Sequence, residues 1–224
     1  LRTQDAVAQR MRVRRRAAGA LDFETFQPRA VFEGDRVVAI QQQVQNRARQ
    51  LIEEFMIATN TCTAQFLAQH DRSALRRVVR SPERWQRIQQ VARKYGEELP
   101  PEPDSRALEA FLARQRKADP QRFPDLSLVI VKLMGSGEYV VESPRGEPIG
   151  HFGLAVRDYT HSTAPNRRYP DLITLRMVKA LLTGTPSPYG AAELAILAEH
   201  CTRQEDAAQK VERSVRKSEA ALFL

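Results

Sequence analysis

Apolar residues recur at three- and four-residue steps over most of the chain, and this pattern predicts a mainly helical fold. Gly or Pro punctuates most of the junctions between these segments. Helices are predicted over residues 5–18, 43–69, 81–96, 170–183 and 191–222, with a further helix that begins at Ser105.

Four short segments have the pattern of strands instead, namely residues 21–24, 29–33, 37–40 and 138–142. The turn at 33–36 predicts that the second and third of these form a hairpin. Residues 125–133 fit a helix or a buried strand, because periodicity does not separate the two in a short apolar run. We therefore expect an α+β fold, mainly helical, in which long helices pack a few strands.

Several local details follow from the same patterns. Ser81 and Ser105 are predicted as N-caps, with Pro82 at the first position of its helix. Cys62 and Cys201 have neither metal nor disulfide spacing and are predicted to be reduced core residues. The helix over 43–69 is predicted to bury one apolar stripe made of Leu51, Phe55, Ala58, Cys62 and Phe66.

The chain has 224 residues, enough for one domain with a sizeable core. Its 35 Lys and Arg residues against 27 Asp and Glu give a net charge of +8, which favours nucleic acid or another anionic partner. No apolar run is long enough to span a bilayer and no signal peptide is recognisable, so we expect a cytoplasmic protein without a membrane partner. Because Leu1 opens directly into helical sequence, we also expect the chain to be part of a longer polypeptide.

The segment 150–172 carries the strongest chemical pattern. Arg167 and Arg168 stand between two prolines, just before a predicted helix whose first turn contains Asp171. Guanidinium groups bind two phosphate oxygens at once, and backbone N–H groups at a helix start add further donors. Tyr159 and Tyr169 are candidates for stacking on bases. The alternative is a surface loop whose arginines pair with nearby carboxylates, and composition alone leaves both open.

Other charged positions fit either a functional role or an ordinary structural one. Five arginines between residues 10 and 16 form either a phosphate track or a solvated helix face. Glu53 and Glu54 are adjacent on a helix, where such pairs usually face solvent, and Glu212 is spaced to pair with Arg216. The four histidines share no zinc-ligand spacing, so no metal site is predicted within the chain.

The run Tyr159-Thr160-His161-x-Thr163-x-Pro165-x-Arg167-Arg168-Tyr169-Pro170-Asp171-Leu172 resembles the late block of the ribonuclease II / ribonuclease R catalytic domain. Collinear resemblances lie in three further segments, at 19–23, 51–60 and 207–213. Ala164-Pro165-Asn166-Arg167 departs from the family's usual Ser-Pro-Ile-Arg, which bears on packing of the loop but leaves the arginine in place.

The resemblance implies that the chain is the C-terminal part of an RNB-type catalytic domain. Arg167 is then the catalytic arginine, which offsets charge on the scissile phosphate. RNA contacts are implied at Phe23, Glu53, Tyr159, Thr163, Arg168, Tyr169 and Glu212. Phe26 and Phe32 are alternatives to Phe23, and Glu54 is an alternative to Glu53.

The resemblance also implies what lies outside the chain. The family holds Mg²⁺ with a loop of closely spaced aspartates, which we expect before Leu1, and its oligonucleotide-binding domains are expected on both sides. The whole enzyme is then a monomeric, processive 3′→5′ exoribonuclease that hydrolyses single-stranded RNA to 5′-mononucleotides, and this segment alone is inactive. The rival hypotheses are a non-catalytic protein that keeps the RNA channel and a structural helical domain with a basic surface.

Overall fold

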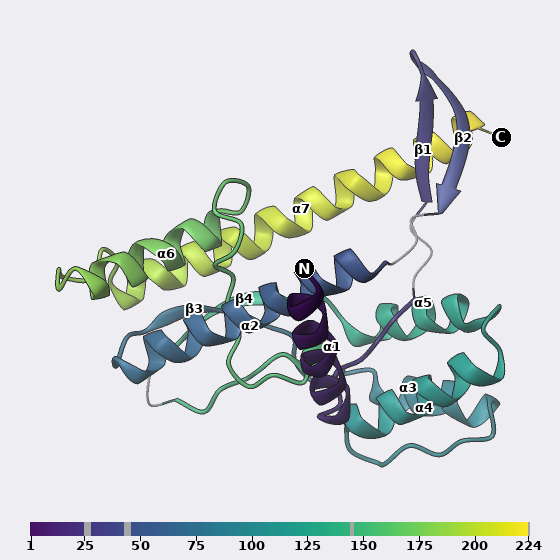
Figure 1. Cartoon of the computed structure of the whole chain (residues 1–224), viewed down its shortest axis with the longest axis horizontal. Coiled ribbons are helices and arrows are strands. Elements are labelled where there is room, and N and C mark those ends of the chain that lie inside the picture. Colours follow the sequence, from purple (N-terminus) through teal and green to yellow (C-terminus); the bar gives the residue numbers. More distant parts are fainter. Residues whose placement is uncertain (25–27, 43–45, 144–145, 224) are drawn as a thin grey trace.

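The computed structural model describes residues 1–24, 28–42, 46–143 and 146–223. These residues form seven α-helices, which dominate the fold, and four short strands (Figure 1). The helices are α1 (Arg2–Ala17), α2 (Arg47–Gln69), α3 (Trp85–Lys94), α4 (Ser105–Ala118), α5 (Phe123–Met134), α6 (Tyr169–Leu182) and α7 (Ala191–Phe223). The predicted mainly helical α+β class is confirmed.

The strands form two separate antiparallel pairs. β1 (Pro28–Glu33) and β2 (Arg36–Gln42) make the predicted hairpin, with a bulge between Val31 and Phe32. β3 (Ala74–Val78) pairs with β4 (Glu138–Glu142). The pattern predicted β4 but missed β3.

The helices and the second sheet bury two apolar clusters. One cluster lies among α3, α4 and α5 and includes Trp85, Phe111 and Ile130. The other joins the end of α2, the β3–β4 sheet, α6 and the first half of α7, around Leu75 and Ile173. The loop that contains the two arginines enters α6, so the second cluster supports its base.

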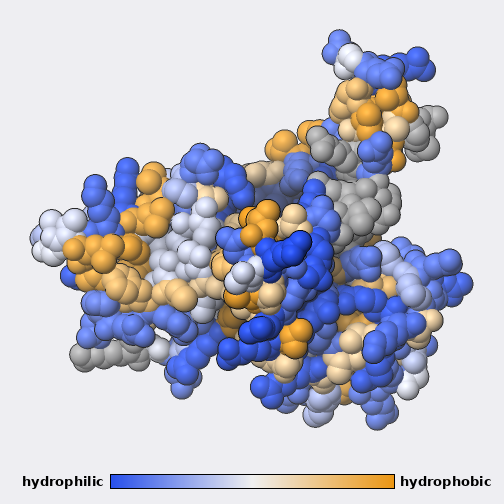
Figure 2. Space-filling view, in the orientation of Figure 1, coloured by the Kyte–Doolittle hydropathy of each residue, from blue (hydrophilic) through white to orange (hydrophobic). Residues whose placement is uncertain are grey.

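The second half of α7 extends away from both clusters, and the β1–β2 hairpin packs against it (Figure 1). From Ala207 to Lys217 every α7 residue is exposed, including the apolar Val211 and Val215. Apolar side chains gather on the projecting hairpin, while much of the face shown in Figure 2 is hydrophilic. No helix in the described ranges combines the length and apolar character needed to cross a membrane.

Two predicted N-caps, Ser81 and Ser105, were wrong. α3 begins at Trp85, three residues after Pro82, because Trp85 N–H donates to the Pro82 carbonyl in a turn that precedes the helix. α4 is capped by Asp104, whose carboxylate accepts from the N–H groups of Arg106 and Ala107, so Ser105 is the first helical residue. The open choice for residues 125–133 is settled as helix α5.

The predicted strand at 21–24 was also wrong. This segment runs without a ladder partner, since its backbone donors go elsewhere: Leu21 N–H to the Gly153 carbonyl, Asp22 N–H to Glu109, and Glu24 N–H to the Ser127 hydroxyl. Chain segments from α4, α5 and the loop before α6 replace a neighbouring strand.

The predicted buried stripe of α2 was wrong as well. Cys62 is exposed and Phe55 is 37% exposed, whereas Cys201 is buried as predicted. The buried face of α2 instead consists of Glu54, Ile57, Asn60, Ala64 and Leu67. The helix turns this face inward because Glu54 and Asn60 find partners there, which the apolar pattern does not reveal.

Candidate functional site

The candidate site is a tight turn that leads into α6. The N–H groups of Arg167 and Arg168 both donate to the Ala164 carbonyl, at 3.2 and 2.9 Å. Arg168 is the N-cap residue in extended conformation, and Pro170 occupies the first turn of the helix. Ala164 and Pro170 are buried on either side, so the turn is fixed at both ends.

The two arginines have different environments. Arg168 donates to Asp171 Oδ1 at 2.7 Å and to the Thr163 hydroxyl at 3.3 Å, and its side chain is 22% exposed. Arg167 is exposed, and its side chain makes no hydrogen bond or ion pair with another described residue. A free guanidinium at a helix start is suited to capture a phosphate. The loop therefore has features of both alternatives. Arg168 is paired with a carboxylate, whereas the guanidinium of Arg167 is available to a phosphate.

A buried polar network holds the segment before the turn. Asn60 is 1% exposed, and its Oδ1 accepts from both the N–H and the hydroxyl of Ser162, at 2.9 and 3.0 Å. Its Nδ2 donates to the Tyr159 hydroxyl at 3.2 Å. The Thr160 hydroxyl donates to the Leu75 carbonyl on β3 at 2.7 Å. Hence α2 and β3 both anchor the segment that carries the arginine turn.

Burial keeps the imidazoles of this network neutral. It lowers the pKa of His161 to about 3, with further lowering by the charges of Arg168 and Arg77. Burial likewise lowers the pKa of His151 to about 4. His161 Nδ1 lies 2.7 Å from the Tyr139 hydroxyl, whose pKa burial raises. These imidazoles act as packing and hydrogen-bonding groups at neutral pH.

Two predicted RNA-contact residues line one cavity of about 620 Å³ beside α2. Glu53 stands at its wall with a side chain 45% exposed, and Tyr159, 8% exposed, closes its other side. The rest of the lining is mostly apolar and includes Ile52, Met56 and Leu154. Both carboxylates contact Arg15, but Glu54 is 2% exposed and does not line this cavity, whereas Glu53 does.

The remaining predicted contact residues are dispersed. Tyr169 is 46% exposed and lines a cavity of about 390 Å³ with residues of α7. Glu212 lies on the exposed half of α7 and pairs with Arg216. Phe23 is partly buried against the α3–α5 cluster. Of its alternatives, Phe32 is 51% exposed on the hairpin, and Phe26 lies outside the described residues.

The arginines of α1 are largely engaged. The Arg15 guanidinium makes a bidentate contact with the Glu54 carboxylate, at 2.6 and 3.2 Å, and also donates to Glu53 at 3.3 Å. Arg12 and Arg16 pair with Asp22, as does Arg116 from α4. Burial lowers the pKa of the Arg16 guanidinium and raises that of the Glu109 carboxyl within the same cluster. This cluster ties α1 to α2 and α4, and only its exposed neighbours Arg10 and Arg14 fit the predicted solvated face.

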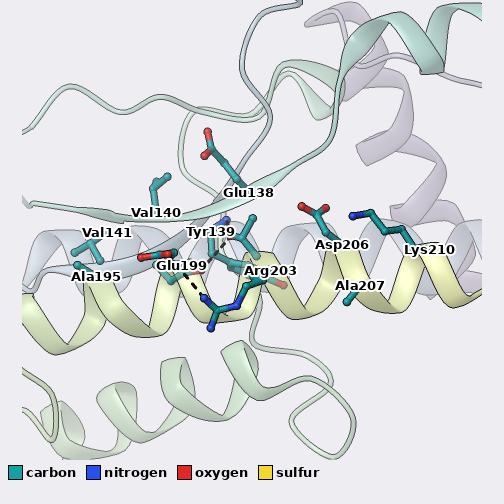
Figure 3. Close-up of a pocket in the computed structure, with 12 residues that line it drawn as sticks. Glu138, Tyr139, Val140, Val141, Ala195, Glu199, Arg203, Asp206, Ala207 and Lys210 are labelled. Carbon is teal, nitrogen blue, oxygen red and sulfur yellow. Dashed lines mark hydrogen bonds and ion pairs between the residues drawn. The ribbon is translucent and has the colours of Figure 1, made fainter.

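A separate groove of about 680 Å³ runs between β4 and α7 (Figure 3). Arg203 pairs with Glu199 at 3.9 Å on its α7 wall, and Tyr139 N–H donates to the Thr202 hydroxyl at 2.8 Å. No predicted site residue lines it. Its charges are of both signs, which fits attachment of α7 to the sheet better than capture of an anion.

The sequence did not predict the residues that hold the site in place. Asn60 lies in a helix among apolar positions, where it interrupts the stripe formed by Ile57, Ala64 and Leu67, and it ends the segment 51–60 that resembles the family. Asp171 was predicted in the first turn of α6, which is confirmed, but its contacts to the preceding turn were not. Within the described ranges no three His, Cys, Asp or Glu side chains are grouped as metal ligands.

Comparison with known proteins identifies the family. The model of the RNB domain matches residues 1–184. Ribonuclease R of Escherichia coli (strain K12) is 32% identical over 221 residues, a match that covers 90% of this chain and 26% of the relative. The chain thus spans about a quarter of the length of this curated relative.

Solved structures have the same fold. Mycoplasma genitalium RNase R in its apo form gives a TM-score of 0.87 at 21% identity, over 100% of this chain and 36% of that one. Its complex with ribose methylated single-stranded RNA gives 0.87 at 20% identity, over the same 100% and 36%. Yeast Ssd1, described as a pseudonuclease, gives 0.72 at 19% identity, over 99% of this chain and 27% of that one. With the match over residues 1–184, the chain belongs to the RNB domain family.

Proposed function

We propose that this chain forms the C-terminal part of the catalytic domain of a 3′→5′ exoribonuclease, which hydrolyses single-stranded RNA processively to 5′-mononucleotides. The observation that carries the proposal is the exposed side chain of Arg167, which has no partner among the described residues and lies at the tip of a turn whose neighbouring arginine is held by a carboxylate. The likeness to ribonuclease R, one structure of which contains single-stranded RNA, supports RNA as the substrate.

In this proposal Arg167 is the catalytic residue of the chain. Its guanidinium contacts the scissile phosphate and offsets the charge that develops on the phosphate oxygens in the transition state. The 22% exposed edge of Arg168 and the Thr163 hydroxyl contact an adjacent phosphate. Backbone N–H groups at the start of α6 add positive potential at the same place.

The other contacts recognise the nucleotides. The cavity beside α2 takes a base or ribose, because its apolar floor suits a flat ring and Glu53 can accept from a ribose hydroxyl. Tyr159 forms the wall of that cavity, and Tyr169 offers an exposed ring for stacking. Phe23 and Glu212 contact the RNA at other points of its path.

The metal-binding half of the site belongs outside this chain. We propose that aspartates in the preceding part of a longer polypeptide hold Mg²⁺, which activates water and stabilises the leaving oxygen. The described residues do not themselves group three ligands for such an ion. The complete protein is proposed to act as a cytoplasmic monomer, with oligonucleotide-binding domains on either side of the catalytic domain.

The proposal is tested with the full-length protein and a 5′-labelled single-stranded oligoribonucleotide in the presence of Mg²⁺. We expect progressive loss of the 3′ end without accumulation of intermediates when excess unlabelled RNA traps any released enzyme. Internal cleavage fragments, or shortening from the 5′ end, would contradict it.

The likeness to yeast Ssd1 supports a second candidate, a non-catalytic RNA-binding protein. The same experiment separates the two, provided that RNA binding is measured in parallel. Binding without any metal-dependent hydrolysis favours the second candidate, and so does the absence of an aspartate-rich loop upstream in the full polypeptide.

A further inference from the structure

Asp171 is a buried carboxylate that the proposed chemistry does not use. It is 0% exposed and lies in the first turn of α6. Its Oδ1 accepts from the Ala164 N–H at 2.8 Å and from Arg168 Nη2 at 2.7 Å. Its Oδ2 has no hydrogen-bond partner in the described part of the chain. One oxygen therefore binds both ends of the turn that carries Arg167.

The tip of this turn has little else to hold it. Pro165, Asn166 and Arg167 are all exposed, and the Arg167 side chain makes no hydrogen bond or ion pair with another described residue. The direction of Arg167 consequently depends on the backbone between Ala164 and Arg168. That backbone closes through the two N–H bonds to the Ala164 carbonyl, and the Asp171 carboxylate links the Ala164 N–H to the side chain of Arg168.

A carboxylate at this place is costly for the fold. Burial of a charge is compensated only by well-placed partners, and here one of the two oxygens lacks a hydrogen bond. The charge is matched by Arg168 alone among the described side chains. The arrangement fixes the geometry of the turn, since a charged hydrogen bond to an arginine is short and directional.

We propose that Asp171 is a positioning residue, which fixes the 164–168 turn so that Arg167 meets the scissile phosphate. The inference rests on the proposed role of Arg167 in hydrolysis. A displacement of a catalytic group by about 1 Å costs on the order of 100-fold in rate, so a looser turn lowers turnover far more than RNA binding. Arg168 therefore supports the turn in addition to contacting an adjacent phosphate, and Arg167 acts on the scissile phosphate.

The test is a double-substitution cycle in the full-length protein, with kcat and KM measured on a single-stranded oligoribonucleotide. Asp171→Asn keeps an oxygen for the Ala164 N–H but removes the charge that holds Arg168. We expect kcat to fall about 100-fold with KM changed less than about 3-fold. In the Arg167→Ala background the same substitution should lower kcat less than about 3-fold, because there is no longer a guanidinium to position.

Asp125→Asn is the matched control, since Asp125 lies in the first turn of α5, is exposed and has no ion pair with a described residue. It should leave kcat and KM unchanged. Arg168→Lys covers the case in which Asp171→Asn does not fold, because it keeps the charge against Asp171 and loses only the guanidinium fork. It should lower kcat about 10-fold, again only when Arg167 is present.

The outcomes separate the inference from the proposed function. The positioning role is overturned if Asp171→Asn lowers kcat equally in both backgrounds, or lowers it in neither. The proposed function still stands in that case if Arg167→Ala alone lowers kcat. If Arg167→Ala leaves kcat unchanged, the proposed function fails, and the positioning role fails with it.

Discussion

The chain has two clusters of arginine, and they differ in how their charges are balanced. On α1, Arg12, Arg15 and Arg16 all reach carboxylates, and Arg15 closes on a glutamate that is 2% exposed. In the turn before α6, Arg168 is paired, and the Arg167 side chain has no partner among the residues that the structure describes. Arginine density in the sequence is higher in the first cluster, where Arg10 and Arg14 are exposed as well. The turn differs because it places an exposed guanidinium, that of Arg167, beside the start of a helix. Pairing decides which arginine is structural, and it depends on residues distant in sequence.

The sharpest contrast concerns Arg15. Arg15→Met removes the partner of buried Glu54 and should destabilise the full-length protein by about 3–5 kcal/mol, because an uncompensated charge is left inside. Chemical denaturation followed by a probe within the RNB domain measures this loss. Arg14→Met, at an exposed neighbouring position, should stay within about 0.5 kcal/mol. Similar small effects at both sites would mean that the α1 cluster is not structural.

The second expected effect comes from the imidazoles behind the arginine turn. In the unfolded chain His161 takes up a proton near pH 6.5, whereas burial lowers its pKa in the folded protein to about 3. Its contribution to stability is therefore fully present above about pH 6.5 and is lost as the pH falls below that. At pH 5 the loss is on the order of 2 kcal/mol.

His161→Gln should reduce the difference in unfolding free energy between pH 7 and pH 5 by about 2 kcal/mol. Glu109, whose pKa is raised by burial, acts in the opposite direction, but it is common to both proteins and cancels in the comparison. His200→Gln, at an exposed position on α7, is the control and should keep the slope of the unsubstituted protein. An unchanged slope in His161→Gln would contradict the burial of a neutral imidazole.

The smallest effect tests whether the two clusters differ towards RNA. Each neutralised phosphate of a single strand contributes about 0.7 to the slope of log affinity against log salt. Arg167→Ala should reduce this slope by about 0.7, as expected for one lost phosphate contact. Arg16→Gln should leave it unchanged, since Arg16 already pairs with Asp22. A reduced slope in Arg16→Gln would return α1 to the role of a phosphate track.

Local patterns predicted much of the fold. The spacing of apolar residues located α2, α6 and α7, and the turn chemistry located the β1–β2 hairpin. The pattern missed β3, because Arg76 and Arg77 interrupt it. In the folded chain these arginines pair with Glu142 and Glu205, which lie 66 and 128 residues further on. Such distant compensation cannot be inferred from a local window.

In the candidate site, too, local features could be predicted and contacts between distant residues could not. The position of Arg167 beside a helix start follows from the prolines and the apolar periodicity around it. The burial of Asp171 and the hydrogen bonds of Asn60 to Ser162 do not, because they require α2 and α6 to meet around one loop. The pair Glu53 and Glu54 was expected to face solvent, as adjacent glutamates on a helix usually do, yet Glu54 is 2% exposed because it pairs with Arg15.

The central claim is that Arg167 stabilises the transition state of phosphodiester hydrolysis. Single-turnover hydrolysis and equilibrium RNA binding of Arg167→Ala, measured on the full-length protein, test it most directly. The rate constant should fall about 1000-fold, while the dissociation constant rises less than about 5-fold. Comparable losses in rate and in affinity would contradict the claim and leave Arg167 as an ordinary RNA contact.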